Sequence, residues 1–137
     1  MKTSLLCVLA LGLGLAAMPA LAHHSFAAEY DNKKPVSLTG TVTKVEWMNP
    51  HARFYLDVKD GDKVTNWEFE LGSPNGLMRQ GWTRNSMKIG DSISVDGSLA
   101  KDGSNLANAR TVKLSDGKRL FAGSASETGR TDEKKEQ

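Results

Sequence analysis

The chain has 137 residues, a formal net charge of +2 and a hydrophobic fraction of 39%. This length suits one domain with a single core. Basic and acidic residues are interspersed without a basic patch, which argues against nucleic-acid binding. The only cysteine is Cys7, so a chain cleaved after it has no disulfide, no thiolate metal site and no cysteine nucleophile.

Residues 1–22 have the pattern of a secretory signal peptide. Lys2 provides the positive charge, residues 5–17 are apolar, and Ala20-Leu21-Ala22 places small residues before a cut after Ala22. The apolar run is shorter than the roughly 20 residues that span a bilayer, so an uncleaved anchor is the weaker alternative. We expect a periplasmic chain of about 115 residues in an oxidising compartment, without a membrane span.

Alternation of apolar and polar residues predicts strands over residues 36–47, 52–59 and 64–71. In the first strand the apolar parity changes between Val42 and Val45, which predicts a bulge near Thr43. Such a strand is long and bent enough to pair with two neighbours.

The inward faces of the second and third strands set their register. This register places Tyr55 opposite Glu68 and Arg53 opposite Glu70. We therefore predict that both glutamates lie on an exposed outer face, where Arg53 neutralises Glu70.

Ser73 and Pro74 predict the cap and the first residue of a short helix, which Gly81 ends. Further strands are predicted over residues 92–99 and 105–114. Three strands, a helix and two strands follow the order of the OB-fold, a five-stranded, partly open barrel. We thus predict a mainly β, OB-like barrel over residues 23–122, or another small barrel or meander, followed by a disordered tail over residues 123–137.

The three histidines suggest a copper site. Cleavage after Ala22 makes His23 the new N-terminus, where its α-amine and its ring offer two nitrogens; His24 follows it. The third histidine, His51, ends the Trp-Met-Asn-Pro-His turn between the first two strands. Nitrogen ligands favour copper(II) over other divalent metals. We predict that His23 and His51 bind copper, with assistance from His24 or Met48; alternatively, these are a solvated chain end and a turn residue.

A second hypothesis needs no metal. OB-folds bind ligands on the face of their second and third strands, so this domain could bind a small molecule or a periplasmic protein partner. No spacing indicates catalytic residues, although a copper oxidase or monooxygenase is a third alternative. The residues of the metal-free site would be Arg53, Tyr55, Glu68, Trp82 and Arg84.

Four segments resemble an uncharacterised family of secreted bacterial proteins, a domain of unknown function. They are HHSFAAEYD, WMNPH, GSPNGLMRQGW and KDGSNLANARTV, and the resemblance runs from His23 to about Gly123. It implies a periplasmic, single-domain protein and no established activity. A looser similarity, to the histidine-brace copper proteins, covers only His23 and, where the fold permits, His51.

Overall fold

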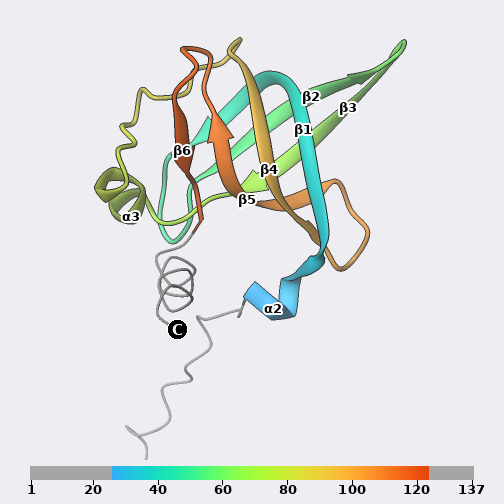
Figure 1. Cartoon of the computed structure of the whole chain (residues 1–137), viewed down its shortest axis with the longest axis horizontal. Coiled ribbons are helices and arrows are strands. Elements are labelled where there is room, and N and C mark those ends of the chain that lie inside the picture. The colour runs from blue at the N-terminus through green and yellow to red at the C-terminus, as the bar shows by residue number, and fades with distance from the viewer. Residues whose placement is uncertain (1–25, 124–137) are drawn as a thin grey trace, which may run out of the picture.

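The structure is a computed structural model that describes residues 26–123 (Figure 1). The predicted signal peptide, His23, His24 and the tail from residue 124 onward lie outside this range. The elements are α2 (Phe26–Glu29), β1 (Tyr30–Glu46), β2 (Arg53–Asp60), β3 (Lys63–Glu70), α3 (Pro74–Arg79), β4 (Ser92–Ala100), β5 (Leu106–Lys113) and β6 (Arg119–Phe121).

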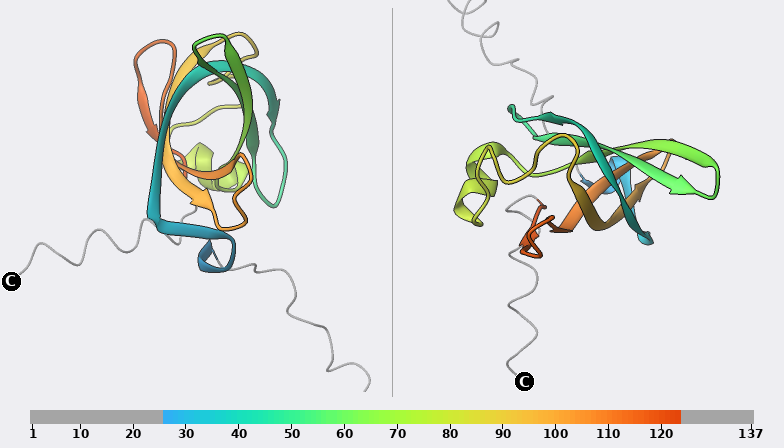
Figure 2. Two further views of the ribbon diagram at one scale, coloured as in Figure 1. Left: turned by 90° about the vertical axis from the view of Figure 1, so that its right-hand side faces the viewer. Right: turned by 90° about the horizontal axis from the view of Figure 1, so that it is seen from above.

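All six strands belong to one sheet, in the order β3-β2-β1-β4-β5-β6 with antiparallel neighbours. The end of β3 also pairs in parallel with the start of β5, through Glu68–Glu70 and residues 106–108. This additional pairing closes the sheet into a ring, which is seen end-on in Figure 2 (left). The prediction of a mainly β protein with a short helix between the third and fourth strands is confirmed.

The prediction of five strands is wrong, because β6 forms a sixth at the edge beside β5. It has only three residues, and Leu120 is the one that is buried. One buried residue in three gives no alternation to detect. The four-residue helix α2 was not predicted either, and it contains no buried residue that would mark an apolar face.

The predicted register and bulge are confirmed. Tyr55 pairs with Glu68 and Arg53 with Glu70 across β2 and β3. The pairing of β1 with β2 shifts between Val42 and Lys44, at the predicted bulge. The bend lets β1 pair with β4 over its first part and with β2 over its last. Because β1 begins at Tyr30, it is six residues longer at its start than predicted.

The core fills the inside of the ring. Phe54 and Phe69 stack there with their ring centroids 5.1 Å apart. Burial of such side chains, each contributing about 1.5–3 kcal/mol, stabilises the ring without any cross-link. The largest fully buried side chains are Phe54, Phe69, Leu56, Leu77, Ile93, Val42, Val95 and Val112.

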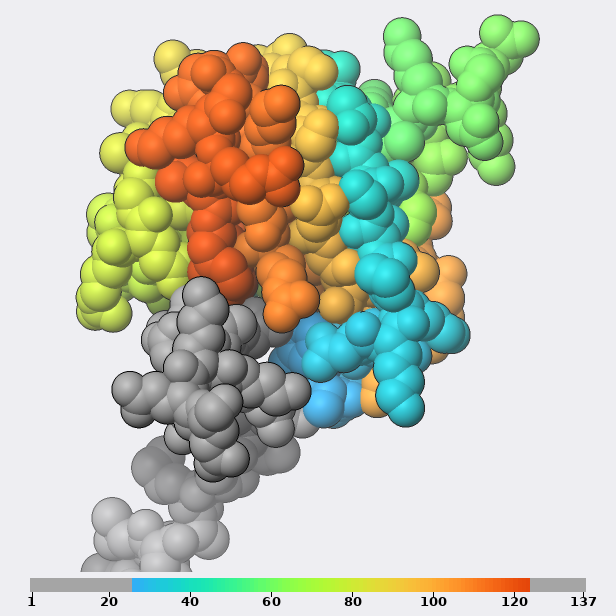
Figure 3. All heavy atoms as spheres, in the orientation of Figure 1, coloured from blue at the N-terminus to red at the C-terminus, as the bar shows by residue number. Residues whose placement is uncertain are grey.

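The hairpin of β2 and β3 extends beyond the ring. Its tip stands clear of the remaining atoms in the space-filling view (Figure 3). Val64 on this hairpin is 52% exposed. Within residues 26–123, no helix has the length and apolar character needed to cross a bilayer.

Replacing Ser73 by alanine should lower the free energy of unfolding by about 1 kcal/mol. The Ser73 side chain caps α3 by accepting a hydrogen bond from the Gly76 backbone N–H at 3.2 Å, and Pro74 occupies the first turn. Urea denaturation of the wild type, Ser73→Ala and Ser73→Thr would measure this. The threonine variant, which keeps an acceptor, should lose less; equal losses for both would contradict the capping role.

Candidate functional site

His51 lies in the turn between β1 and β2, and this turn is fastened to the segment after β3. The Ala52 N–H donates to the Gly72 carbonyl at 3.0 Å, and the Leu71 N–H donates to the Ala52 carbonyl at 2.9 Å. Two backbone hydrogen bonds directly after His51 therefore fix where its Cα sits. Figure 1 shows the turn at the lower left of the ring and α2 below the ring.

The ring of His51 has one nitrogen engaged. Its Nδ1 lies 3.0 Å from the Leu71 carbonyl oxygen. Because a carbonyl oxygen only accepts, this hydrogen bond requires the proton on Nδ1, so in the neutral ring the lone pair is on Nε2. The side chain is 40% exposed. Histidines that bind metals generally donate their other ring N–H to a carbonyl or carboxylate in this way.

Glu70 lies beside this ring and is buried, with 8% of its surface exposed. Its Oε1 is 3.9 Å from the His51 Nδ1, and its Oε2 accepts from the Tyr30 hydroxyl at 3.1 Å and from Arg53 Nη2 at 3.3 Å. The prediction of an exposed Glu70 is therefore wrong, although its pairing with Arg53 is confirmed. Tyr30, at the start of β1, and the His51 turn cover it, and strand alternation alone does not reveal such a cover.

Tyr30 is the residue that the sequence analysis missed. It is 2% exposed, and its ring centroid lies 5.4 Å from that of Phe26 in α2. Burial, reinforced by the nearby Glu70 carboxylate, raises the pKa of its phenol far above the ordinary value. The phenol therefore remains a neutral donor to Glu70 throughout the physiological pH range. Forty residues separate the two partners, so no local motif could have revealed the pair.

The five residues of the metal-free hypothesis fall into two groups. On the outer face of β2 and β3, Arg53 makes a close ion pair with Glu68, and the Tyr55 hydroxyl donates to Glu46 at 3.3 Å. Trp82 and Arg84 lie elsewhere, on the segment that follows α3.

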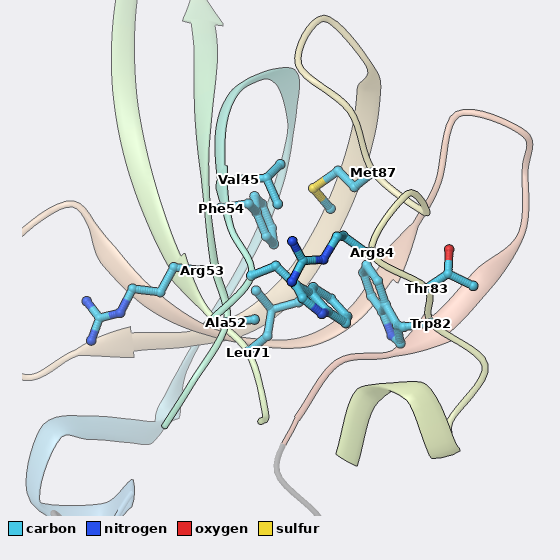
Figure 4. Close-up of a pocket in the computed structure, with 10 residues that line it drawn as sticks. Val45, Ala52, Arg53, Phe54, Leu71, Trp82, Thr83, Arg84 and Met87 are labelled. Carbon is cyan, nitrogen blue, oxygen red and sulfur yellow. The ribbon is translucent and has the colours of Figure 1, made fainter. Parts of the chain in front are cut away.

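Trp82 is buried and donates its indole N–H to the Phe121 carbonyl at 2.7 Å. With Arg84 and Met87 it lines an apolar depression between this segment and the β1–β2 turn (Figure 4). Arg53 belongs to the wall, but its side chain points away from the other labelled residues. The cavity measures about 10 Å³, the room for about one water molecule, so a larger ligand would have to displace side chains.

Of the predicted copper ligands, the structure places His51 and Met48 in one turn. Met48 is 55% exposed, and the Asn49–Pro50 peptide bond between them is cis. Among residues 26–123, no group of three histidine, cysteine, aspartate or glutamate side chains is arranged to hold a metal ion. His23 and His24 precede the described part of the chain.

Comparison with known proteins identifies the family. Residues 12–109 match the family of unknown function DUF6152. The chain belongs to DUF6152. This confirms the resemblance to an uncharacterised family. The matched region includes all three histidines as well as Tyr30 and Glu70. No curated protein and no solved structure matches the chain.

Proposed function

We propose that this protein binds copper in the periplasm and holds or delivers the ion. The ligands would be the α-amine and ring of His23, as the N-terminus after signal cleavage, and the Nε2 of His51. His24 or Met48 would assist. The observation that carries the proposal is the His51 ring, which is held through Nδ1 while Nε2 keeps its lone pair.

The hydrogen bond to Leu71 favours metal binding in two ways. It fixes the tautomer, so that the outward nitrogen is the one able to coordinate, and it fixes the plane of the ring. The Glu70 carboxylate lies 3.9 Å from the same nitrogen, beyond hydrogen-bond distance, so the Leu71 carbonyl is the group that orients the ring. A neutral imidazole held in this way suits copper(II).

The position of α2 supports a role for His23. Only residues 24 and 25 separate His23 from Phe26, whose ring packs on Tyr30. Tyr30 in turn bonds the carboxylate that lies beside the His51 ring. Three residues span about 10 Å when extended. A free amine at residue 23 would therefore be tethered within about 10 Å of Phe26, which packs on the tyrosine bonded to Glu70.

The signal-peptide pattern and the metal site support each other. An amine exists at His23 only if the chain is cut after Ala22, and such a cut implies export. We propose holding or delivery rather than catalysis, because this role requires only the ligands at residues 23 and 51. We also propose that the ring is OB-like; the helix between β3 and β4 and the β3–β5 closure support this.

Replacing His51 by asparagine should lower copper(II) affinity about 100-fold, or about 2.7 kcal/mol, while the protein stays folded. The asparagine amide can still donate to the Leu71 carbonyl, so the change removes Nε2 but keeps the hydrogen bond of the turn. The measurement is a chelator-competed copper(II) titration of the chain that begins at His23, with EPR to count coordinating nitrogens.

The thermal melting of His51→Asn without copper provides the control and should resemble that of the wild type. One coordinating nitrogen should disappear from the EPR spectrum of the variant. If the variant binds copper with wild-type affinity and an unchanged spectrum, His51 is not a ligand and the proposal is wrong.

A further inference from the structure

We propose that one side of the ring docks the protein on an anionic lipid surface. This side is formed by α3 with the segment after it and by the adjoining β1–β2 turn, residues 74–90 and 47–51, and we call it the α3 side. It lies opposite the tip of the β2–β3 hairpin (Figures 1 and 2). Its exposed apolar side chains enter the headgroup layer, and its basic side chains bind lipid phosphates. This docking does not depend on copper.

Exposed large apolar side chains gather on the α3 side. Four such side chains stand out within residues 26–123, and three of them lie here: Ile89 is 71% exposed, Met48 55% and Met78 50%. The fourth, Val64, lies on the hairpin. Single exposed apolar residues are ordinary on a protein surface, but three of four on one side favour a surface that contacts a partner. Trp47, half-buried beside Met48, adds a ring of the kind enriched at membrane–water interfaces.

The parts of the α3 side are fixed relative to each other. The turn and the segment after α3 line one apolar depression together, with Trp47 from the turn and Arg84 from the segment in its wall. The segment is also hydrogen-bonded to the ring at two points. The Trp82 indole donates to a β6 carbonyl at 2.7 Å, and the Gly90 N–H donates to the Val42 carbonyl at 2.8 Å. Exposed side chains between these points therefore project from a backbone that needs little ordering on docking.

The α3 side is positively charged. Residues 71–90 contain no aspartate or glutamate, but they contain Arg79, Arg84 and Lys88. None of the ion pairs within residues 26–123 involves these three side chains. The next acidic residue, Asp91, accepts a hydrogen bond from the Lys88 backbone N–H at 2.9 Å. Because lipid-binding basic clusters usually contain about four to eight residues, these three need the contribution of the apolar side chains.

The shape of the α3 side favours a lipid surface over a folded protein partner. Anchor residues at protein interfaces fill pockets, but the apolar depression measures only about 10 Å³, too little for a side chain. The exposed apolar residues instead each adjoin a basic one: Met78 directly precedes Arg79, and Ile89 directly follows Lys88. Such pairs match a headgroup layer, where the apolar side chain reaches the acyl boundary and the basic one stays with the phosphates.

The test measures cosedimentation of the chain that begins at His23 with lipid vesicles, without copper. The wild type should bind vesicles of equal parts phosphatidylcholine and phosphatidylglycerol, and bind pure phosphatidylcholine far more weakly. Each basic residue near an anionic surface contributes roughly fivefold to binding, so Arg84→Gln/Lys88→Gln should weaken it about 25-fold. Ile89→Ser should weaken it about tenfold, because the interface buries only part of the side chain.

The hairpin on the opposite side provides matched controls. Val64→Ser removes an exposed apolar side chain there, and Lys59→Gln/Lys63→Gln removes the same charge from exposed positions. Both should bind anionic vesicles as the wild type does, whereas non-specific attraction of the whole chain would be weakened equally by either charge change. Thermal melting of every variant should resemble that of the wild type, because each altered side chain is exposed.

A fluorophore that responds to polarity measures which side meets the lipid. The chain that begins at His23 contains no cysteine, so Asn85→Cys on the α3 side and Val64→Cys on the hairpin each accept one label. Both positions are exposed in the structure. Anionic vesicles should shift the emission of the label at residue 85 to shorter wavelength and leave that of the label at residue 64 unchanged.

Weaker vesicle binding by the α3-side variants, with unchanged binding by the hairpin variants, supports lipid docking. Equal weakening by both sets, no preference for anionic vesicles, or a shift at residue 64 alone would overturn it. If the wild type binds no vesicles but self-associates in analytical ultracentrifugation, and Ile89→Ser prevents this, the α3 side is a contact between copies and lipid docking is wrong.

Discussion

Adding Gly-Ser-Gly in front of His23 should lower copper(II) affinity at least about 100-fold. The extension converts the α-amine of His23 into an amide, which removes one coordinating nitrogen and the chelate ring that it forms with the imidazole. Mutation of a residue that only hydrogen-bonds to a metal ligand typically lowers metal affinity about 10–100-fold. Loss of a direct ligand should lower the affinity by at least as much, and 100-fold corresponds to about 2.7 kcal/mol.

The extension needs three residues. With one or two added residues, a histidine becomes third in the chain, and a third-position histidine can chelate copper through its ring, the terminal amine and the intervening amides. That new site would hide the loss of the natural one. With three added residues, His23 is fourth and His24 is fifth, so neither occupies the third position.

The matched control places the same three residues after Gln137, at the other end of the chain. This control should bind copper as the unextended chain does, with the same EPR spectrum. If the N-terminal extension also leaves affinity and spectrum unchanged, the amine of His23 does not bind copper. His51→Asn then decides separately whether the ring at residue 51 does.

Local patterns predicted what depends on neighbouring residues. The alternation along β2 and β3 determined which side chains face inward, and matching those faces gave the register of Arg53 and Tyr55. The parity change in β1 located its bulge, and Ser73 with Pro74 located the start of α3. Each of these features follows from the preferences of a few consecutive residues.

Contacts between distant segments could not be predicted in this way. Alternation assigns Glu70 to the outer face, but only the tertiary structure shows that Tyr30 and the β1–β2 turn cover that part of the face. The parallel pairing of β3 with β5 could not be predicted from either strand, because the alternation of apolar and polar residues shows which side chains face inward but not which strand lies alongside. The sequence did indicate His51, but not which of its nitrogens is free.

Gly97→Ala should be the most destabilising of the substitutions considered, because it disturbs the closure of the ring. A Cβ at residue 97 would lie 2.0 Å from the Asn108 carbonyl oxygen, and this neighbour is backbone, which cannot swing aside. Asn108 in turn pairs with Glu70 where β5 meets β3. The added methyl group therefore displaces β5 at the point where its pairing with β3 completes the ring.

We expect the free energy of unfolding to fall by about 3 kcal/mol or more, at the upper end of the range for overpacked sites. For a domain of this size, this corresponds to a drop in Tm of roughly 10–20 °C. Gly61→Ala in the β2–β3 turn is the control, because it introduces backbone strain without a steric clash. Gly61 has a φ of 58°, but a Cβ there meets no atom within 4 Å, so its replacement should cost only about 1–2 kcal/mol.

Thermal and urea denaturation of both variants, without copper, would test this difference. Because Glu70 pairs with Asn108, a shifted β5 should also disturb the carboxylate that Tyr30 and Arg53 share. Equal losses of stability in the two variants would mean that β4 relaxes at its irregularity between Asp96 and Gly97, and that the close approach to Asn108 does not hold the ring closed.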